Sequence, residues 1–136
     1  MTHPLVIERE TVYPHSPERV WRALVDPEEL ARWLMPTDFA PRVGHEFKLE
    51  TGSAEVGTIQ GEVLEIDEPH LLRCRWSGGF GDTEVTFTLS PEADGTRLRV
   101  RHDGWTDPVP SEHAGFVGGW AEKLDETLPR VLDSTS

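Results

Sequence analysis

The last third of the chain carries an apolar pattern that predicts one long amphipathic helix over residues 111–132. Apolar side chains recur there every three or four residues, the spacing that places them on one face of an α-helix; they are Phe116, Trp120, Leu124, Leu128 and Val131. Gly115, Gly118 and Gly119 lie in its first half, where a glycine costs about 1 kcal/mol relative to alanine. We therefore expect these glycines to face the rest of the protein and to leave a hollow there. Pro129, at about 3 kcal/mol in a helix interior, predicts a kink or an end of the helix near that point.

Alternation of apolar and polar residues precedes this helix and predicts six strands. The expected strands lie near residues 5–13, 47–49, 59–66, 72–76, 85–89 and 98–102. Between the first two, Ser16 before Pro17 and Asp26 before Pro27 each mark a helix start, because Ser and Asp cap helices and proline fits the first turn. Glu29, three residues after Asp26, is expected to complete a capping box. The predicted order is one strand, two short helices, five strands and a long helix.

Length, composition and charge limit the class of protein. The length of 136 residues predicts one domain over residues 1–136, and five Trp and five Phe within a hydrophobic content of 36% predict a folded chain. Thirteen Lys and Arg against 25 Asp and Glu give a net charge of −12, which makes nucleic acid an unfavourable partner. The strongest basic stripe, Arg97, Arg99 and Arg101, is interpreted as a solvated outer face offset by nearby acids.

The cysteine count and the lack of targeting signals indicate the compartment. A single cysteine, Cys74, excludes an internal disulfide and fits a reducing compartment. It lies in the apolar phase of its strand, so we expect a buried and inert thiol. The N-terminus lacks a basic and then apolar signal sequence, and no apolar run is long enough to span a bilayer. The sequence therefore predicts a cytoplasmic protein with no membrane partner.

Several stretches together resemble one protein superfamily. They are the run SPERVW at residues 16–21, the run DPEELARW at 26–33, residues 61–69, 85–89 and 95–98, and the late pair Gly119 and Trp120 followed by Leu124. These stretches are similar to the SRPBCC superfamily, which is START-like and includes birch-pollen-allergen-like proteins. Within it, the chain most resembles the group related to the C-terminal domain of the activator of the heat-shock protein 90 ATPase. Two departures are Gly44-His45, where relatives usually carry a glycine pair, and Pro129.

The resemblance implies an α+β helix-grip fold. In that fold a curved antiparallel sheet of about six strands wraps round a long C-terminal helix, with two short helices between strands 1 and 2. It often encloses a cavity for an apolar ligand. The superfamily spans ligand carriers, aromatase and cyclase enzymes, resistance proteins and chaperone-binding modules, so the resemblance transfers no catalytic residue to this chain.

The candidate site is therefore built from residues that the strand and helix patterns place inward. They form a predicted ligand-binding set of Arg9, Phe47, Trp76, Phe87, Val100, His102, Phe116 and Trp120. For any one of the apolar members, ordinary core packing is the competing interpretation. Buried polar groups need a partner or a wet cavity, so Arg9 is expected either to hold an anionic or carbonyl group or to reach water or an acidic neighbour near its strand end.

Three functions stay open at this point. The preferred one is binding of a small, largely apolar or aromatic molecule between the sheet and the C-terminal helix. The second is a cavity enzyme of cyclase or hydrolase type, with His102 as the best general acid or base; Asp103, its neighbour, points to the opposite face of the strand. The third is a chaperone-interaction module with an exposed apolar patch. The six histidines show no metal-ligand spacing, no metal or other cofactor is expected, and a homodimer is one option for the oligomeric state.

Overall fold

The computed structural model describes residues 6–52, 57–78, 80–105 and 112–134, and it confirms the predicted helix-grip architecture. One antiparallel sheet has the strand order β1-β6-β5-β4-β3-β2. Its strands are β1 (Ile7–Tyr13), β2 (Glu46–Glu50), β3 (Thr58–Asp67), β4 (Leu71–Gly78), β5 (Gly81–Glu92) and β6 (Gly95–Asp103). The helices are α1 (Pro17–Val25), α2 (Pro27–Trp33), α3 (Glu112–Glu122), the π-helix η1 (Lys123–Thr127) and α4 (Leu128–Ser134). Leu5 and Ser111, where the sequence places the starts of the first strand and the long helix, lie outside the described residues.

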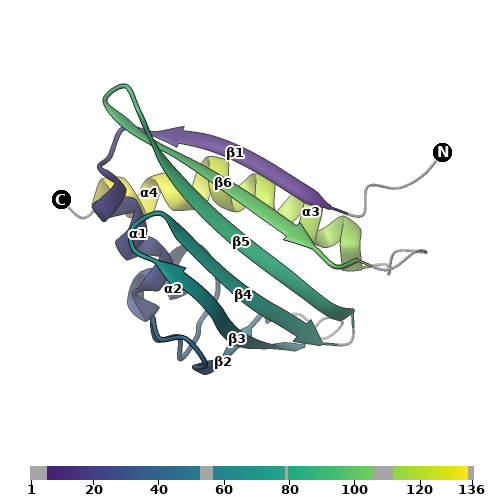
Figure 1. Ribbon diagram of the computed structural model, residues 1–136. Coiled ribbons are helices and arrows are strands. Elements are labelled where there is room, and N and C mark those ends of the chain that lie inside the picture. The colour runs from purple at the N-terminus through teal and green to yellow at the C-terminus, as the bar shows by residue number, and fades with distance from the viewer. Residues whose placement is uncertain (1–5, 53–56, 79, 106–111, 135–136) are drawn as a thin grey trace.

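The curved sheet wraps round the C-terminal helical segment. Figure 1 shows α3, η1 and α4 in line behind β1 and β6, with α1 and α2 at the end of the sheet near α4. Strand residues alternate between a buried inner phase and an exposed outer phase, as period-two patterning requires. The inner phases of the strands and the apolar faces of the helices form one core, which includes Trp33, Ile59, Leu98, Leu124 and Leu128.

The two short helices begin where the capping residues predict. The Ser16 side chain accepts the Arg19 N–H at 3.2 Å, and the Asp26 side chain accepts the Glu28 N–H at 2.9 Å. The expected capping box is wrong, because the Asp26 N–H bonds to the Arg22 carbonyl instead. The Glu29 carboxylate is turned toward two arginines of α1. Glu29 thus forms partly buried salt bridges with Arg19 and Arg22 in place of the capping-box hydrogen bond.

The C-terminal helix corrects the expectation for Pro129. The alternative in which the helix ends near Leu128 is wrong, because α4 begins at Leu128 and continues to Ser134. The five residues before it form the π-helix, in which the Leu128 N–H bonds to the Lys123 carbonyl five residues back. The hydrogen bonds of this turn therefore span five residues and not four, just before Pro129, which has no N–H to donate.

The glycines of α3 overturn the predicted hollow. Gly115 and Gly118 are exposed and Gly119 is half-buried, and a Cβ at any of the three would meet nothing within 4 Å. Gly115 and Gly118 therefore face away from the sheet, and Gly119 has no close neighbour there. The helix turns Phe116 and Trp120 toward the sheet, and its outer face carries the small residues.

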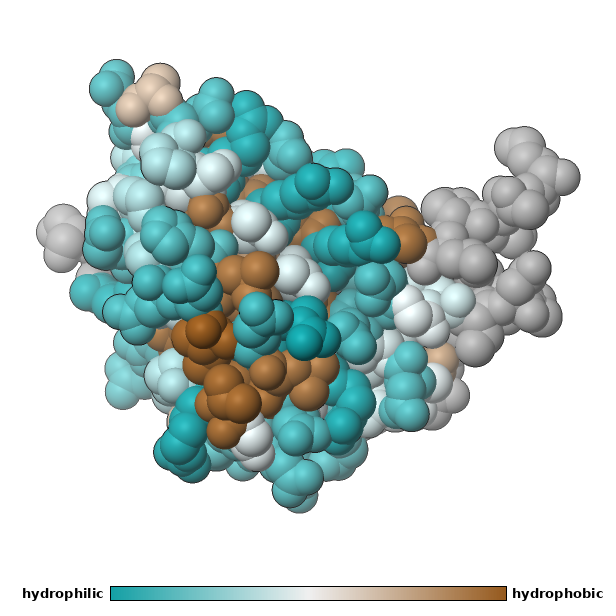
Figure 2. Space-filling model, viewed as in Figure 1, coloured by the Kyte–Doolittle hydropathy of each residue, from teal (hydrophilic) through white to brown (hydrophobic). Residues whose placement is uncertain are grey.

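The outer face of the sheet is charged over β1 and β6, as the interpretation of the basic stripe requires. Arg99 pairs with Glu8, Arg97 with Glu10, and Arg101 with Asp103. Arg97 also pairs with Glu92 of β5 at 3.1 Å. Figure 2 shows this hydrophilic surface together with an apolar patch over β3 and β4. Half-buried Leu64 and Leu71 belong to these two strands.

Candidate functional site

An aromatic cluster occupies the space between the sheet and α3. Trp76 comes from the inner phase of β4, His102 from β6, and Phe116 and Trp120 from the inner face of α3. Trp76 and Trp120 are stacked with ring centroids 5.6 Å apart, and Phe87 of β5 meets Trp120 edge-on at 5.9 Å. These centroid distances are those of packed aromatic pairs. Four of these five residues are buried, and Phe116 is half-buried.

His102 is the polar centre of this cluster. It is fully buried, and Trp76, Trp105, Phe116 and Trp120 surround it with ring centroids 4.8 to 6.2 Å away. Its Nδ1 accepts a hydrogen bond from the indole N–H of Trp120 at 3.1 Å. A histidine whose two nitrogens have different partners has a defined tautomer.

The hydrogen-bond chain assigns that tautomer. The Thr83 hydroxyl lies 2.8 Å from both the Trp76 carbonyl and His102 Nε2. A carbonyl can only accept, so the hydroxyl proton goes to Trp76, and Thr83 Oγ1 accepts from the Nε2–H of His102. The imidazole is therefore neutral, with Nδ1 an acceptor and Nε2 a donor. Protonation at Nδ1 would turn a second donor toward the Trp120 N–H, in a buried position where a charge is costly.

The structure brings six of the eight predicted site residues to this region. Trp76, Phe87, His102, Phe116 and Trp120 share ring contacts, and Val100 lies opposite Phe87 in the β5–β6 register. The other two lie elsewhere. Arg9 pairs with Asp125 at 2.7 Å on the surface, where its side chain is 41% exposed, so the prediction that it reaches an acidic neighbour is the one that holds. Phe47 belongs to β2, at the opposite edge of the sheet, and packs edge-on against Phe39.

Three members of the cluster were missed from the sequence. Thr83 lies two and four residues before Val85 and Phe87 on β5. Alternation along the strand therefore predicts that all three side chains face the same, inner side. Phe80 contacts Trp105 and Phe116 at 5.8 and 5.1 Å. Phe80 and Trp105 flank strand ends, beyond the alternating pattern, and no local signal predicts that the fold brings them together.

The remaining chemistry of the site is apolar. Cys74 lies on β4 two residues before Trp76, and burial raises the pKa of its thiol to about 12, against a smaller lowering by Arg73. The thiol is therefore not a nucleophile at neutral pH. Among the described residues no group of three His, Cys, Asp or Glu side chains could hold a metal ion. Within the part of the chain that the structure describes, the cluster offers aromatic surface and the acceptor nitrogen Nδ1 of His102.

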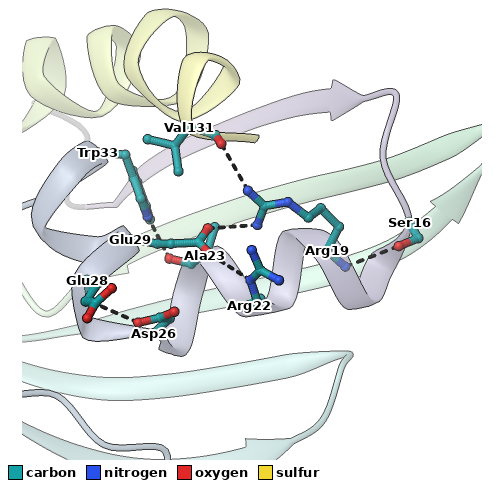
Figure 3. Close-up of polar contacts among 9 residues, drawn as sticks. All are labelled: Ser16, Arg19, Arg22, Ala23, Asp26, Glu28, Glu29, Trp33 and Val131. Carbon is teal, nitrogen blue, oxygen red and sulfur yellow. Dashed lines mark hydrogen bonds and ion pairs between the residues drawn. The ribbon is translucent and has the colours of Figure 1, made fainter. Parts of the chain in front are cut away.

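A second polar group ties α1, α2 and α4 together (Figure 3). Arg19 and Arg22 each donate a 2.7 Å hydrogen bond to a different oxygen of the buried Glu29 carboxylate. Arg19 also donates to the Val131 carbonyl at 3.0 Å, and the Trp33 indole N–H donates to the Ala23 carbonyl at 2.7 Å. Both oxygens of the carboxylate accept hydrogen bonds from guanidinium groups. We therefore interpret this cluster as stabilising the fold and not as part of a ligand site.

The pKa of Glu29 reflects the same contacts. Burial by itself raises the pKa of this carboxyl group, whereas the hydrogen bonds and charges of Arg19 and Arg22 lower it. The two arginines prevail, and the pKa lies below its ordinary value of 4.5. Glu29 is therefore ionised at neutral pH.

The curved sheet, the helix it grips and the aromatic cluster between them define a helix-grip protein of the SRPBCC superfamily. The chain belongs to the family described as Activator of Hsp90 ATPase homolog 1-like protein, whose model matches residues 14–133. The protein MLL2253 from Mesorhizobium loti is 33% identical, with a TM-score of 0.87, over 96% of this chain and 98% of that chain.

Two further structures resemble this chain. DynU16, described as a protein in the dynemicin biosynthetic locus, is 25% identical over 97% of this chain, with a TM-score of 0.80, and the match spans 48% of DynU16. The Aha1 dimer from Colwellia psychrerythraea is 20% identical over 98% of this chain and 100% of that chain, with a TM-score of 0.83, which is a likeness of fold. No curated protein matches the sequence. Within the described ranges no helix is long and apolar enough to cross a membrane.

Proposed function

We propose that this protein binds a small, largely apolar or aromatic molecule between the sheet and α3, with residues 1–136 acting as one cytoplasmic domain. The observation that carries the proposal is the aromatic cluster round His102, with Trp76 and Trp120 stacked at its centre. Aromatic surface with few polar groups is typical of sites for apolar ligands. The resemblance to DynU16, whose description places it in a biosynthetic locus for a small molecule, supports a ligand of this kind.

The proposal is tested by titrating the protein with flat aromatic compounds and fatty acids. A ligand that binds the folded state alone raises stability by RT ln(1 + [L]/Kd), so it raises the melting temperature in a concentration-dependent way. Trp76 and Trp120 also report binding through tryptophan fluorescence. A broad panel that shifts neither signal would contradict the proposal.

A filling substitution locates the site. Val100→Phe adds volume beside Phe87, where Val100 is 1% exposed, and is expected to reduce the ligand-induced shift in melting temperature. Val12→Phe on the outer face of β1, where Val12 is 48% exposed, is the matched control and should leave the shift unchanged. Because each variant is compared with and without ligand, a lower basal stability does not affect the result.

The cyclase or hydrolase alternative is less well supported. A general base needs a free lone pair near the substrate, and both ring nitrogens of His102 already have partners, Trp120 and Thr83. The chemistry of the described cluster therefore favours binding over catalysis.

Protein interaction is the second candidate function. The apolar patch over β3 and β4 in Figure 2 is the kind of surface that such a module exposes. The family name supplies a partner to test, the Hsp90 ATPase. We expect the purified protein alone not to stimulate ATP turnover by Hsp90, and a clear increase on mixing would favour this second function.

A further inference from the structure

We propose that Trp120 occupies the place of the ligand, and that the ligand is a planar fused aromatic molecule with one N–H or O–H donor, which replaces the Trp120 indole against Trp76 and His102. This inference rests on the proposed function and names the chemical class that the site would take. It is carried by the contacts of Trp120, by the tautomer of His102 and by the composition of α3.

The Trp120 indole is held as a bound aromatic ligand would be. One face stacks on Trp76 at a centroid distance of 5.6 Å and an interplanar angle of 25°. Phe87 and His102 lie edge-on to it, at interplanar angles of 73° and 86°. The indole N–H donates to His102 Nδ1 at 3.1 Å, and the residue is 2% exposed. A fused bicyclic ring with one donor satisfies every one of these contacts.

The hydrogen-bond chain behind His102 selects the polar group of the ligand. The Thr83 hydroxyl donates its proton to the Trp76 carbonyl and accepts a hydrogen bond from the Nε2–H of His102. Nδ1 of His102 therefore carries no proton and acts as an acceptor. A carboxylate or an ether oxygen in place of the indole N–H would turn a lone pair toward the lone pair of Nδ1. A buried acceptor that is left without a donor costs the desolvation penalty of that group. The site therefore favours a neutral molecule that donates one hydrogen bond.

The helix that carries Trp120 is suited to moving away. Gly115, Gly118 and Gly119 weaken α3 without any packing in return, since a Cβ at each would meet nothing within 4 Å. Beyond Trp120 the chain is clamped to β1, because Tyr13 bonds to the Leu124 carbonyl and Arg9 and Thr11 bond to Asp125. Low helix propensity on one side of a fixed point favours opening of that segment by itself. Opening of α3 withdraws Trp120 and uncovers Trp76 and Nδ1.

The ligand class is tested with 2-naphthol, 2-methoxynaphthalene and naphthalene as probes of the wild-type protein. We expect 2-naphthol to bind about tenfold more tightly than 2-methoxynaphthalene, the factor that corresponds to one net hydrogen bond of about 1.4 kcal/mol. In a ¹⁵N-labelled sample the indole N–H signal of Trp120, assigned by its loss in Trp120→Phe, should shift on binding. Trp120→Phe, which keeps a ring but cannot donate, should bind 2-naphthol more tightly than the wild type.

Other binding results would contradict either the ligand class proposed here or the proposed function as a whole. Equal affinities for 2-naphthol and 2-methoxynaphthalene, or binding with no shift of the Trp120 signal, would overturn this inference and leave the proposed function standing. Binding of fatty acids while all three naphthalenes fail would do the same. If nothing in the broad panel binds, the proposed function and this inference fall together.

The opening of α3 has a separate test. Gly118→Ala should raise the melting temperature and weaken 2-naphthol binding by up to about fivefold, because a helix stabilised by about 1 kcal/mol opens less often. Ala31→Gly on the exposed face of α2 changes helix propensity in the opposite direction and should leave the affinity unchanged. An affinity unaffected by Gly118→Ala would contradict opening at α3.

Discussion

The hydroxyl of Tyr13 donates a 2.6 Å hydrogen bond to the backbone carbonyl of Leu124. In η1 the N–H of Leu128 bonds to Lys123, five residues back, and so does not reach the Leu124 carbonyl. The residue five positions after Leu124 is Pro129, which has no N–H. Tyr13 therefore supplies from β1 the donor that the helix lacks. Burial raises the pKa of Tyr13 above its ordinary value of 10.0, which keeps the hydroxyl protonated.

Tyr13→Phe is expected to lower the free energy of unfolding by about 1 to 3 kcal/mol, because it leaves the Leu124 carbonyl buried without a donor. Urea unfolding measures the change. In a Pro129→Ala background the restored N–H at position 129 can bond to Leu124, so the same substitution should there have a smaller effect. An equal loss in both backgrounds would show that the proline does not create the need for Tyr13.

Glu29→Gln is expected to destabilise the protein by about 3 kcal/mol, since it removes the carboxylate charge that pairs with the partly buried Arg19. The pKa of Glu29 is lower in the folded state than its ordinary 4.5, so its contribution is present above pH 4.5 and is lost as the pH falls through the folded value. Unfolding measured from pH 7 to pH 3 should therefore show a smaller acid loss in Glu29→Gln than in the wild type. Glu28→Gln, at an exposed neighbouring position, is the control and should follow the wild-type profile. Parallel profiles for Glu29→Gln and the wild type would refute this assignment.

Gly61→Ala is expected to cost about 1 to 3 kcal/mol of stability by overpacking. Gly61 lies opposite Phe47 in the β2–β3 register, and a Cβ there would lie 2.3 Å from the Phe47 ring. Thermal unfolding measures the loss. Combining it with Phe47→Leu, which shortens the side chain above the glycine, should make the two effects less than additive. Strict additivity would mean that the ring moves aside freely.

The Cys74 thiol is expected to resist labelling in the native protein. The side chain is buried and its pKa is raised to about 12, so at pH 8 almost none of it is thiolate. A thiol reagent should react at a rate limited by unfolding, and urea should accelerate the reaction. Rapid labelling without denaturant would show that the β4 region opens far more readily than its packing implies.

The order of the elements and the inner face of most of them were predictable from the sequence. Ser16 and Asp26 start the helices they were expected to start, because capping depends on residues three or fewer positions away. Trp76, Phe87 and His102 are buried as their strand parity predicts. Which face of a strand a residue occupies depends only on its position within that strand, so the sequence predicts it before the tertiary structure is known.

The partners of those inner faces were decided by tertiary structure alone. Arg9 shares the inner phase of β1 with Tyr13, yet one residue pairs with Asp125 and the other with the Leu124 carbonyl, more than 100 positions along the chain. The glycines of α3 turned out to face outward because Phe116 and Trp120 anchor the opposite side of that helix. Periodicity assigns a residue to a face of its own element. Which groups meet on that face depends on how distant elements pack, and that is why the sequence determined the fold class and only the folded chain placed the indole of Trp120 on His102.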